Sequence, residues 1–309
     1  MRSTQLDSAG FAALYQRLRA HWGPADRRGA LKHLTPEAVR AAAAEVRTGT
    51  TVTLSAPVDR DLGPDNPEPA RYRMTSGVSE PDGAEVGGLH FAADRIAMNV
   101  HGDVNSHIDA LCHVIYDGKL YNDVPANTLT SLGASELSID VVRDGIVGRG
   151  VLLDIPRVRG VSWLEPGDHV TFDDLVAAER AQGVHVRAGD LLLVRVGHRR
   201  RRNELGPWDA AATRAGLHPL ALQFVAQRRV AALGSDSNND TAPSCVDGVA
   251  FPVHVLAINA MGLHLLDYLQ FEVLASLCDA ENRWSFLCVV APLRLTAATG
   301  SPVNPIAVL

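Results

Sequence analysis

The chain has 309 residues, 46% of them hydrophobic and 21% charged, so it is long and apolar enough to bury a substantial core. Its formal net charge of -6 argues against a general nucleic-acid surface, because such a surface needs a basic face. No apolar run reaches the roughly 18 residues of a membrane span, and the N-terminus lacks a secretory signal pattern. We therefore expect a cytoplasmic globular protein with a small-molecule ligand and no nucleic-acid or membrane partner.

Hydrophobic periodicity and turn residues predict helices and strands along most of the chain. The first 48 residues predict a helical lead-in, in which Thr35 and Pro36 supply the N-cap and first turn of the second helix. No repeat, low-complexity segment or composition shift divides the chain, so we expect one α/β or α+β domain over residues 1–309. Helices are expected at 8–21, 36–47, 172–182 and 218–228, strands at 50–55, 150–155, 191–196 and 230–233, and a loop at 59–69.

Two local features have ordinary structural explanations. The basic run from His198 to Arg202 follows a predicted strand and predicts a solvated loop, with a contact to an anionic substrate or another subunit as the alternative. The four cysteines form no CxxC pair and are too few to cross-link a chain of this size, so we expect reduced, buried thiols. These cysteines are Cys112, Cys245, Cys278 and Cys288.

The segment 101–113 carries the strongest chemical signal. Its odd positions are His, Asp, Asn, His, Asp, Leu and His, and its even positions are small or apolar. In an extended strand, successive side chains point to opposite faces, so the histidines and aspartates would share one face. Crowded imidazoles and carboxylates need a compensating cation, which favours a divalent metal bound by His107, Asp109 and His113. An exposed edge strand with a hydrated polar face is the alternative.

The chemistry of these side chains narrows the choice of metal. Imidazole and carboxylate ligands without a thiolate suit zinc or manganese, and they disfavour iron–sulfur or copper(I) chemistry. Cys112 has the wrong parity to join the polar face. GxSxG is absent, and the glycine clusters fit neither GxGxxG nor a P-loop, so serine-hydrolase and nucleotide-binding functions have little support.

A second histidine-bearing stretch lies near residues 254–267. His254 and Asp267 are thirteen positions apart, which on one continuous helix places them about 140° from each other. Gly262 can end a helix that His254 opens, and a following strand can return Asp267 toward the helix start. Without further evidence, the two residues are at least as well explained by structural roles, a buried hydrogen-bonded histidine and a helix-capping aspartate, as by a shared site.

Several motifs resemble, in order and over nearly the whole chain, the larger branch of the putative cyclase superfamily, which includes bacterial kynurenine formamidase and isatin hydrolase. The central one is the HxDxxxH element at 107–113, with Ala-Leu-Cys before its last histidine, followed by YDGKLYN at 116–122. The others are Trp22-Gly23-Pro24, Leu34-Thr35-Pro36-Glu37, Gly216-Leu217-His218, Leu233-Gly234-Ser235-Asp236 and Gly300-Ser301-Pro302-Val303-Asn304-Pro305.

This resemblance implies a β-rich α/β domain, with a mixed sheet or barrel-like core and surrounding helices, that assembles as a homodimer or homotetramer. It also implies metal-assisted hydrolysis of amide-type bonds, as in aryl formamides or cyclic amides, with zinc or manganese as the cofactor. The implied metal ligands are His107, Asp109, His113 and Asp267; the implied catalytic residues are His254, Asp267 and His218; and the expected substrate contacts are His101, Asp103 and Asp236.

Two of these residues also have purely structural explanations. Asp236 can belong to a polar turn, and His218 can be a histidine at a helix start whose side chain is hydrogen-bonded to the backbone. Two positions also depart from the kynurenine formamidase pattern. Asp103 lies four residues before the HxDxxxH element, where those enzymes have a histidine, and Asp267 replaces a glutamate. We therefore expect one firmly held metal ion. A metal-dependent cyclase or dehydratase, a lactone hydrolase, and a non-catalytic binding protein of the same fold are the functional alternatives.

Overall fold

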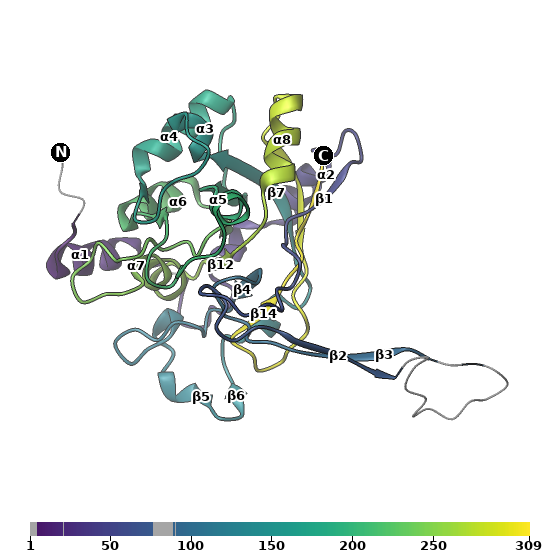
Figure 1. Cartoon of the computed structure of the whole chain (residues 1–309). Coiled ribbons are helices and arrows are strands. Elements are labelled where there is room, and N and C mark those ends of the chain that lie inside the picture. Colours follow the sequence, from purple (N-terminus) through teal and green to yellow (C-terminus); the bar gives the residue numbers. More distant parts are fainter. Residues whose placement is uncertain (1–4, 21, 77–88, 90) are drawn as a thin grey trace.

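The computed structural model describes residues 5–20, 22–76, 89 and 91–309. Within them, a nine-stranded mixed sheet curls into a half-barrel, and helices pack around it (Figure 1). This arrangement confirms the expected fold class. In sheet order the strands are β1 (Thr51–Thr53), β15 (Ile306–Val308), β13 (Ser285–Val290), β7 (Ile146–Asp154), β9 (Leu191–Arg195), β11 (Ala232–Ser235), β12 (His264–Asp267), β4 (His107–Asp109) and β14 (Gly300–Pro302).

The centre of the sheet is parallel and its flanks are antiparallel. β7, β9, β11 and β12 run parallel to one another, and every other neighbouring pair in the sheet is antiparallel. Parallel strands are covered on both faces, which explains why Leu191–Arg195 is a continuous buried run rather than an alternating one. The α-helices are α1 (Ser8–Leu18), α2 (Pro36–Ala43), α3 (Ile155–Arg159), α4 (Phe172–Gln182), α5 (His198–Leu205), α6 (Leu222–Arg228), α7 (Pro252–His254) and α8 (Glu272–Glu281).

Helix α4 has the predicted bounds, and Thr171 closes a capping box at its start. The Thr35 side chain accepts a hydrogen bond from Ala38 N, as expected of an N-cap, but α2 ends at Ala43 rather than near residue 47. Helix α1 ends at Leu18; His21, the predicted end, lies outside the described residues. The predicted helix 218–228 is divided into a short 3-10 turn and α6.

Two sequence predictions are wrong. The basic run is not a solvated loop but the start of α5, in which His198 and Arg199 are buried. Three of its arginines form ion pairs: Arg200 with Glu204, Arg201 with Glu165, and Arg202 with Asp59 and Asp65. The buried Arg199 donates instead to backbone carbonyl oxygens. The segment 101–113 forms a strand only at 107–109, because the chain bends at 101 and 103–105 before β4 and turns from Ala110 to His113 after it.

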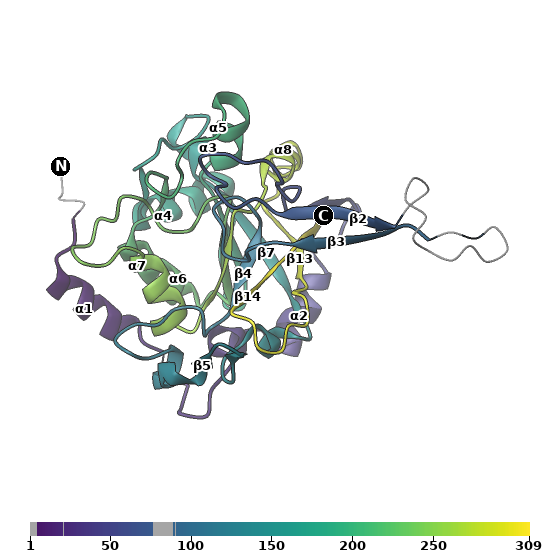
Figure 2. The same ribbon diagram turned by 60° about the horizontal axis from the view of Figure 1, so that its bottom comes forward.

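A separate ribbon of β2 (Arg71–Ser76) and β3 (Ala93–Ala97) projects from the body of the protein (Figures 1 and 2). Almost all of its residues are exposed.

The expected homodimer or homotetramer stays a prediction, which sedimentation velocity will test. Within the described residues, no helix combines the length and hydropathy needed to cross a membrane, and the four cysteines are buried and unpaired, as expected.

Gly262 ends the helical segment that begins at Pro252, and its φ of +66° is in the left-handed region. A Cβ at this position would lie 2.5 Å from the Tyr121 ring, which is fully buried and has no room to move. We therefore expect Gly262→Ala to lower the free energy of unfolding by about 3 kcal/mol, the sum of a backbone and an overpacking cost. Denaturant titration measures this change.

Gly160 provides the matched control, because its φ is +69° but a Cβ there would meet no atom within 4 Å. Gly160→Ala should cost only the backbone contribution, about 1–2 kcal/mol. Equal losses in the two variants would contradict the expected clash with Tyr121.

Candidate metal centre

The register of β4 and β12 brings three candidate ligands onto one face of the sheet. His107 lies directly opposite Asp267 in the antiparallel ladder, so their side chains are neighbours on the same face. Asp109 lies two residues further along β4 and therefore points to that face as well. His107 Nε2 is 3.7 Å from Asp109 Oδ1 and 4.0 Å from Asp267 Oδ2. All three residues are buried.

His254 completes this cluster from the other side. The chain passes from α7 into a π-helix at Val255–Ala260, turns at Gly262 and returns as β12, which is the helix-and-strand return predicted for His254 and Asp267. His254 Nε2 lies 3.3 Å from both Asp109 Oδ2 and Asp267 Oδ2. The imidazole therefore faces two carboxylates at once.

Asp240 orients His254. One carboxylate oxygen accepts a hydrogen bond from Val253 N at 2.7 Å, and the other accepts from His254 N at 2.9 Å and from His254 Nδ1 at 2.6 Å. Because Nδ1 donates to Asp240, Nε2 is the nitrogen presented to the cluster. The sequence placed Asp240 only in a polar stretch after β11, and no local pattern linked it to a histidine fourteen residues later.

The cluster ligands are held by further hydrogen bonds. His107 Nδ1 donates to the carbonyl oxygen of Asn105 at 2.8 Å, which directs Nε2 toward the carboxylates. Asn238 Nδ2 donates to Asp267 Oδ2 at 2.9 Å, and Asn239 Nδ2 donates to Asp267 Oδ1. These contacts fix ring and carboxylate orientations before any ligand arrives.

His101 and His113 form a second group around Asp109. His101 Nδ1 lies 2.8 Å from Asp109 Oδ1, and its Nε2 lies 2.9 Å from Thr299 Oγ1. The His101 and His113 rings stack at a centroid distance of 3.7 Å. The predicted triad of His107, Asp109 and His113 is therefore divided, and Asp109 belongs to both groups: His107–Asp109–Asp267 and His101–Asp109–His113.

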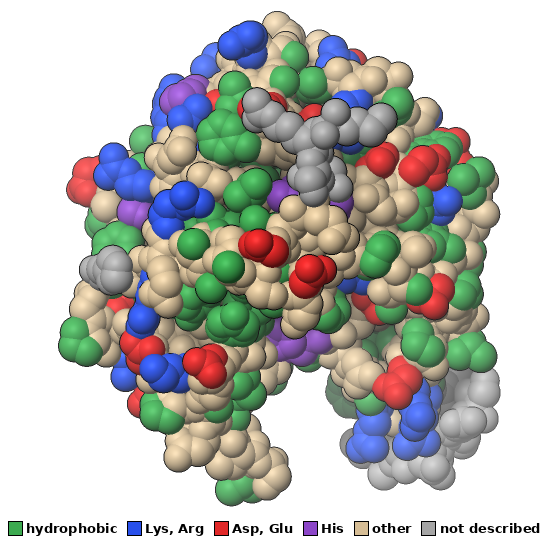
Figure 3. All heavy atoms as spheres, turned by 90° about the vertical axis from the view of Figure 1, so that its left-hand side faces the viewer, with side chains coloured by type: hydrophobic (Ala, Val, Ile, Leu, Met, Phe, Trp, Pro, Cys, Tyr) green, Lys and Arg blue, Asp and Glu red, His purple; other side chains and the backbone are tan. Residues whose placement is uncertain are grey.

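The centre opens into a cavity of about 550 Å³. Figure 3 shows histidine side chains within a hollow of the molecular surface, beside hydrophobic side chains. No lysine or arginine lines the cavity within the described part of the chain. Its apolar wall consists of Val114, Ile115, Val249, Ala250, Phe251 and Val255.

Asp103 also lines this cavity, beside the metal-ligand candidates. The buried Tyr268 donates its hydroxyl to Asp103 Oδ1 at 2.7 Å. Tyr268 has a φ of +53°, a conformation that is costly for a residue with a side chain and is typical of functional sites. Asp103 is thus held by an ordered phenol at the edge of the site.

Asp109 is fully buried behind the cavity wall, and two other predicted site residues, Asp236 and His218, also do not line the cavity. Asp236 is buried below β11, where its carboxylate accepts hydrogen bonds from Val196 N at 2.7 Å and Gly197 N at 2.9 Å. His218 accepts a hydrogen bond from Leu220 N at the start of the 3-10 turn, and its ring packs against His169. The structural alternatives therefore describe both residues better than the functional ones.

Charge at the centre is shared among buried groups. Burial alone would lower the pKa of His254, but the carboxylates of Asp267, Asp109 and Asp240 raise it well above its ordinary value. Burial would raise the pKa of Asp109, yet the nearby His113, the hydrogen bond from His101 and the close approach of His254 hold it well below its usual range. Burial lowers the pKa of His113 to about 4. A cation bound at the centre would therefore compete with protons.

The donor set fits a divalent metal. Asp109 Oδ2 is buried and receives no well-aligned hydrogen bond from the described residues, although His254 Nε2 is near. Leaving a buried carboxylate oxygen unpaired is costly, and a cation removes that cost. The ligand atoms of His107, Asp109 and Asp267 all lie within 4.8 Å of one another. Three protein ligands beside an open cavity are the arrangement of catalytic metal sites.

Comparisons with known proteins agree with this architecture. The family model named Putative cyclase matches residues 52–239. A crystal structure of a novel cyclase shares 32% identity with the chain, covers 96% of it and 99% of its own length, and has a TM-score of 0.86. No functionally curated protein matches the sequence.

Two more distant structures share the fold. Isatin hydrolase A from Labrenzia aggregata, bound to benzyl benzoate, is 21% identical, with 86% of this chain and 94% of that chain covered and a TM-score of 0.59. Isatin hydrolase A from Ralstonia solanacearum is 20% identical, with coverages of 88% and 97% and a TM-score of 0.58. With a family model over residues 52–239 and a solved relative at 32% identity, the chain belongs to the Putative cyclase family.

Proposed function

We propose that the chain is a metal-dependent hydrolase that cleaves an amide-type bond in an aryl formamide, a cyclic amide or a related carbonyl substrate. The observation that carries this proposal is the buried group of His107, Asp109 and Asp267 at the base of a cavity with an apolar wall. The shared fold of the isatin hydrolases, whose name gives a cyclic amide as substrate, supports the substrate class.

A divalent ion held by His107, Asp109 and Asp267 would lower the pKa of a bound water and polarise a substrate carbonyl. The same ion would neutralise the carboxylates of Asp109 and Asp267 that raise the pKa of His254, and the neutral Nε2 would then be placed to accept a proton from the attacking water and to return it to the leaving nitrogen. The hydrogen bond from His254 Nδ1 to Asp240 keeps Nε2 directed toward Asp109 and Asp267. Asp103, held by Tyr268, offers a hydrogen-bond acceptor to a donor group of the substrate.

The hydrogen bonds of His101 favour one metal ion rather than two. Both of its ring nitrogens already have partners, Asp109 and Thr299, so His101 orients a ligand instead of serving as one. We therefore expect close to one zinc or manganese ion per chain by elemental analysis of protein purified without added metal. Two ions per chain would instead assign the His101–Asp109–His113 group to a second site.

Metal binding should also stabilise the fold, because the centre joins β4, β12 and the helix that carries His254. Metal at about 100 times its Kd should add about 2.7 kcal/mol to the free energy of unfolding. Thermal melts with and without a chelator measure this effect, and re-addition of zinc or manganese in separate samples identifies the better ligand. Melts unchanged by the chelator would contradict a metal held by these residues.

The reaction itself is tested with a screen of N-formyl aryl amines, cyclic imides, isatin and lactones. Hydrolysis in ¹⁸O-labelled water should place the label in the carboxyl product, whereas ring closure or dehydration would leave the product unlabelled. Turnover should vanish on chelation and return with metal. No turnover with any of these compounds, despite bound metal, would overturn the proposed substrate class.

A further inference from the structure

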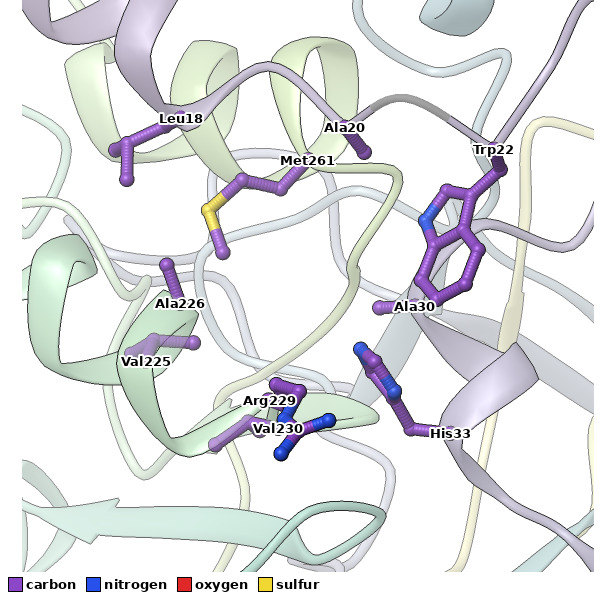
Figure 4. A pocket seen from close by; sticks show the side chains of 10 residues that line it. All are labelled: Leu18, Ala20, Trp22, Ala30, His33, Val225, Ala226, Arg229, Val230 and Met261. Carbon is purple, nitrogen blue, oxygen red and sulfur yellow. The ribbon is translucent and has the colours of Figure 1, made fainter.

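A second cavity, of about 270 Å³, lies near the ends of α1 and α6 (Figure 4). Within the described chain it shares no lining residue with the metal cavity. Met261, which follows the π-helix, lies in its wall, whereas Val255 at the start of that π-helix lines the metal cavity. One helical segment therefore borders both cavities.

The floor of this second cavity is apolar. Leu18, Ala30, Val230 and Met261 are buried there, and Val225 lies beside them on α6. Engineered apolar cavities of about 150 Å³ bind benzene, so a space of 270 Å³ accommodates one aromatic ring and a small substituent. The volume and the apolar lining of this cavity therefore suit a compact, largely apolar ligand.

Among the described residues that line the cavity, the polar groups are cationic or neutral and none is an aspartate or glutamate. Arg229 lies at the rim and forms no ion pair with a carboxylate of the described residues, whereas the adjacent Arg228 pairs with Glu179. Arg229 and His33 stand close together in Figure 4, and the indole nitrogen of Trp22 points toward the same space. Within the described residues that indole N–H has no hydrogen-bond acceptor.

Arg229 also has an unusual backbone. It caps α6 with a φ of +53°, a position that glycine or asparagine normally occupies. The Trp22 ring meets His33 edge to face at 5.0 Å, and burial together with Arg229 lowers the pKa of His33, so this imidazole is neutral at pH 7. The described lining of the cavity therefore presents the positive charge of Arg229, without a described carboxylate partner, beside an aromatic, apolar floor.

We propose that this second cavity binds a small aromatic monocarboxylate, with the ring on the apolar floor and the carboxylate at Arg229. A guanidinium matches the planar geometry of a carboxylate, and an apolar floor favours the ring over a hydrated anion. The proposal concerns a site outside the metal centre, and it does not depend on the reaction proposed there.

Isothermal titration calorimetry with benzoate tests the proposal on the full chain after metal removal by EDTA. We expect saturable binding with a Kd of about 1 mM or lower. Benzamide has the same shape without the charge and should bind at least about fivefold more weakly. Arg229→Asn should weaken benzoate binding by at least about fivefold, because asparagine tolerates the left-handed backbone while removing the charge.

Two controls separate this site from others. Arg180→Gln removes an equally exposed charge on α4 that makes no described ion pair, and it should leave the Kd unchanged. His107→Ala disrupts the metal centre and should also leave the Kd unchanged. Benzoate binding that is lost in His107→Ala but kept in Arg229→Asn would overturn the proposal, as would equal affinity for benzamide or the absence of saturable binding.

Discussion

Replacing Asp109 by asparagine should abolish metal binding and turnover together while the fold persists. Asp109 has no exposed surface, and both of its oxygens face the centre, one beside His101 and the other beside His254. The neutral amide is a poor metal ligand, and it also removes the negative charge that balances the surrounding imidazoles. Loss of a metal that supplies several kcal/mol of transition-state stabilisation corresponds to a fall in kcat/KM of about 1,000-fold or more.

The fold should survive because asparagine has nearly the same volume and β4 keeps its backbone pairing with β12 and β14. Elemental analysis, kinetics and circular dichroism of the same preparation measure the three properties. Asp103→Asn is the matched control, since Asp103 lines the same cavity but is bonded to Tyr268, and this variant should keep its metal. Full metal content and full activity in Asp109→Asn would remove Asp109 from the centre.

Asp240→Asn should reduce kcat by about 100-fold or more and leave the bound metal in place. The Asp240 carboxylate accepts the Nδ1–H of His254, so an amide at this position would no longer secure the ring orientation or its tautomer. His107, Asp109 and Asp267 are unchanged by the substitution. Loss of turnover with retained metal would thus separate proton transfer at His254 from metal binding.

Asp236→Asn is the matched control for this effect. Asp236 is also a buried aspartate after β11 that accepts two backbone N–H groups, but its described hydrogen bonds join it to no residue that lines the cavity. Both variants should lose stability, because each leaves a backbone donor facing an amide. Only Asp240→Asn should lose kcat in the folded fraction. A similar loss of kcat in Asp236→Asn would mean that loop stability, rather than the orientation of His254, limits the reaction.

Local patterns predicted much of the fold and part of the centre. Helix α4 and the cap of α2 follow from capping residues that act within one turn. The return of Asp267 to His254 was also predictable, because a glycine near the end of a helix signals where the chain reverses. In each case the determining residues lie within a few positions of the feature.

Contacts between distant segments could not be predicted in this way. The pairing of His107 with Asp267 depends on the curling of the whole sheet, which no residue near either position encodes. Parity along 101–113 failed because the chain bends at 101 and 103–105 before β4 and turns from Ala110 to His113 after it, so His101 and His113 reach Asp109 by folding back rather than by sharing a strand. The role of Asp240 could not be predicted from the sequence, because only the tertiary structure brings His254 next to it.

The π-helix at Val255–Ala260 limits where relatives of this protein can gain or lose residues. A π-helical turn accommodates an extra residue, and here Met261 N donates to Leu256 O across such a turn. Removing or adding one residue would rotate His254 by about 100° relative to Asp267 and take its imidazole out of the centre. The β2–β3 ribbon carries no ligand of the centre, so insertions and deletions in the family should gather there and be absent between His254 and Asp267.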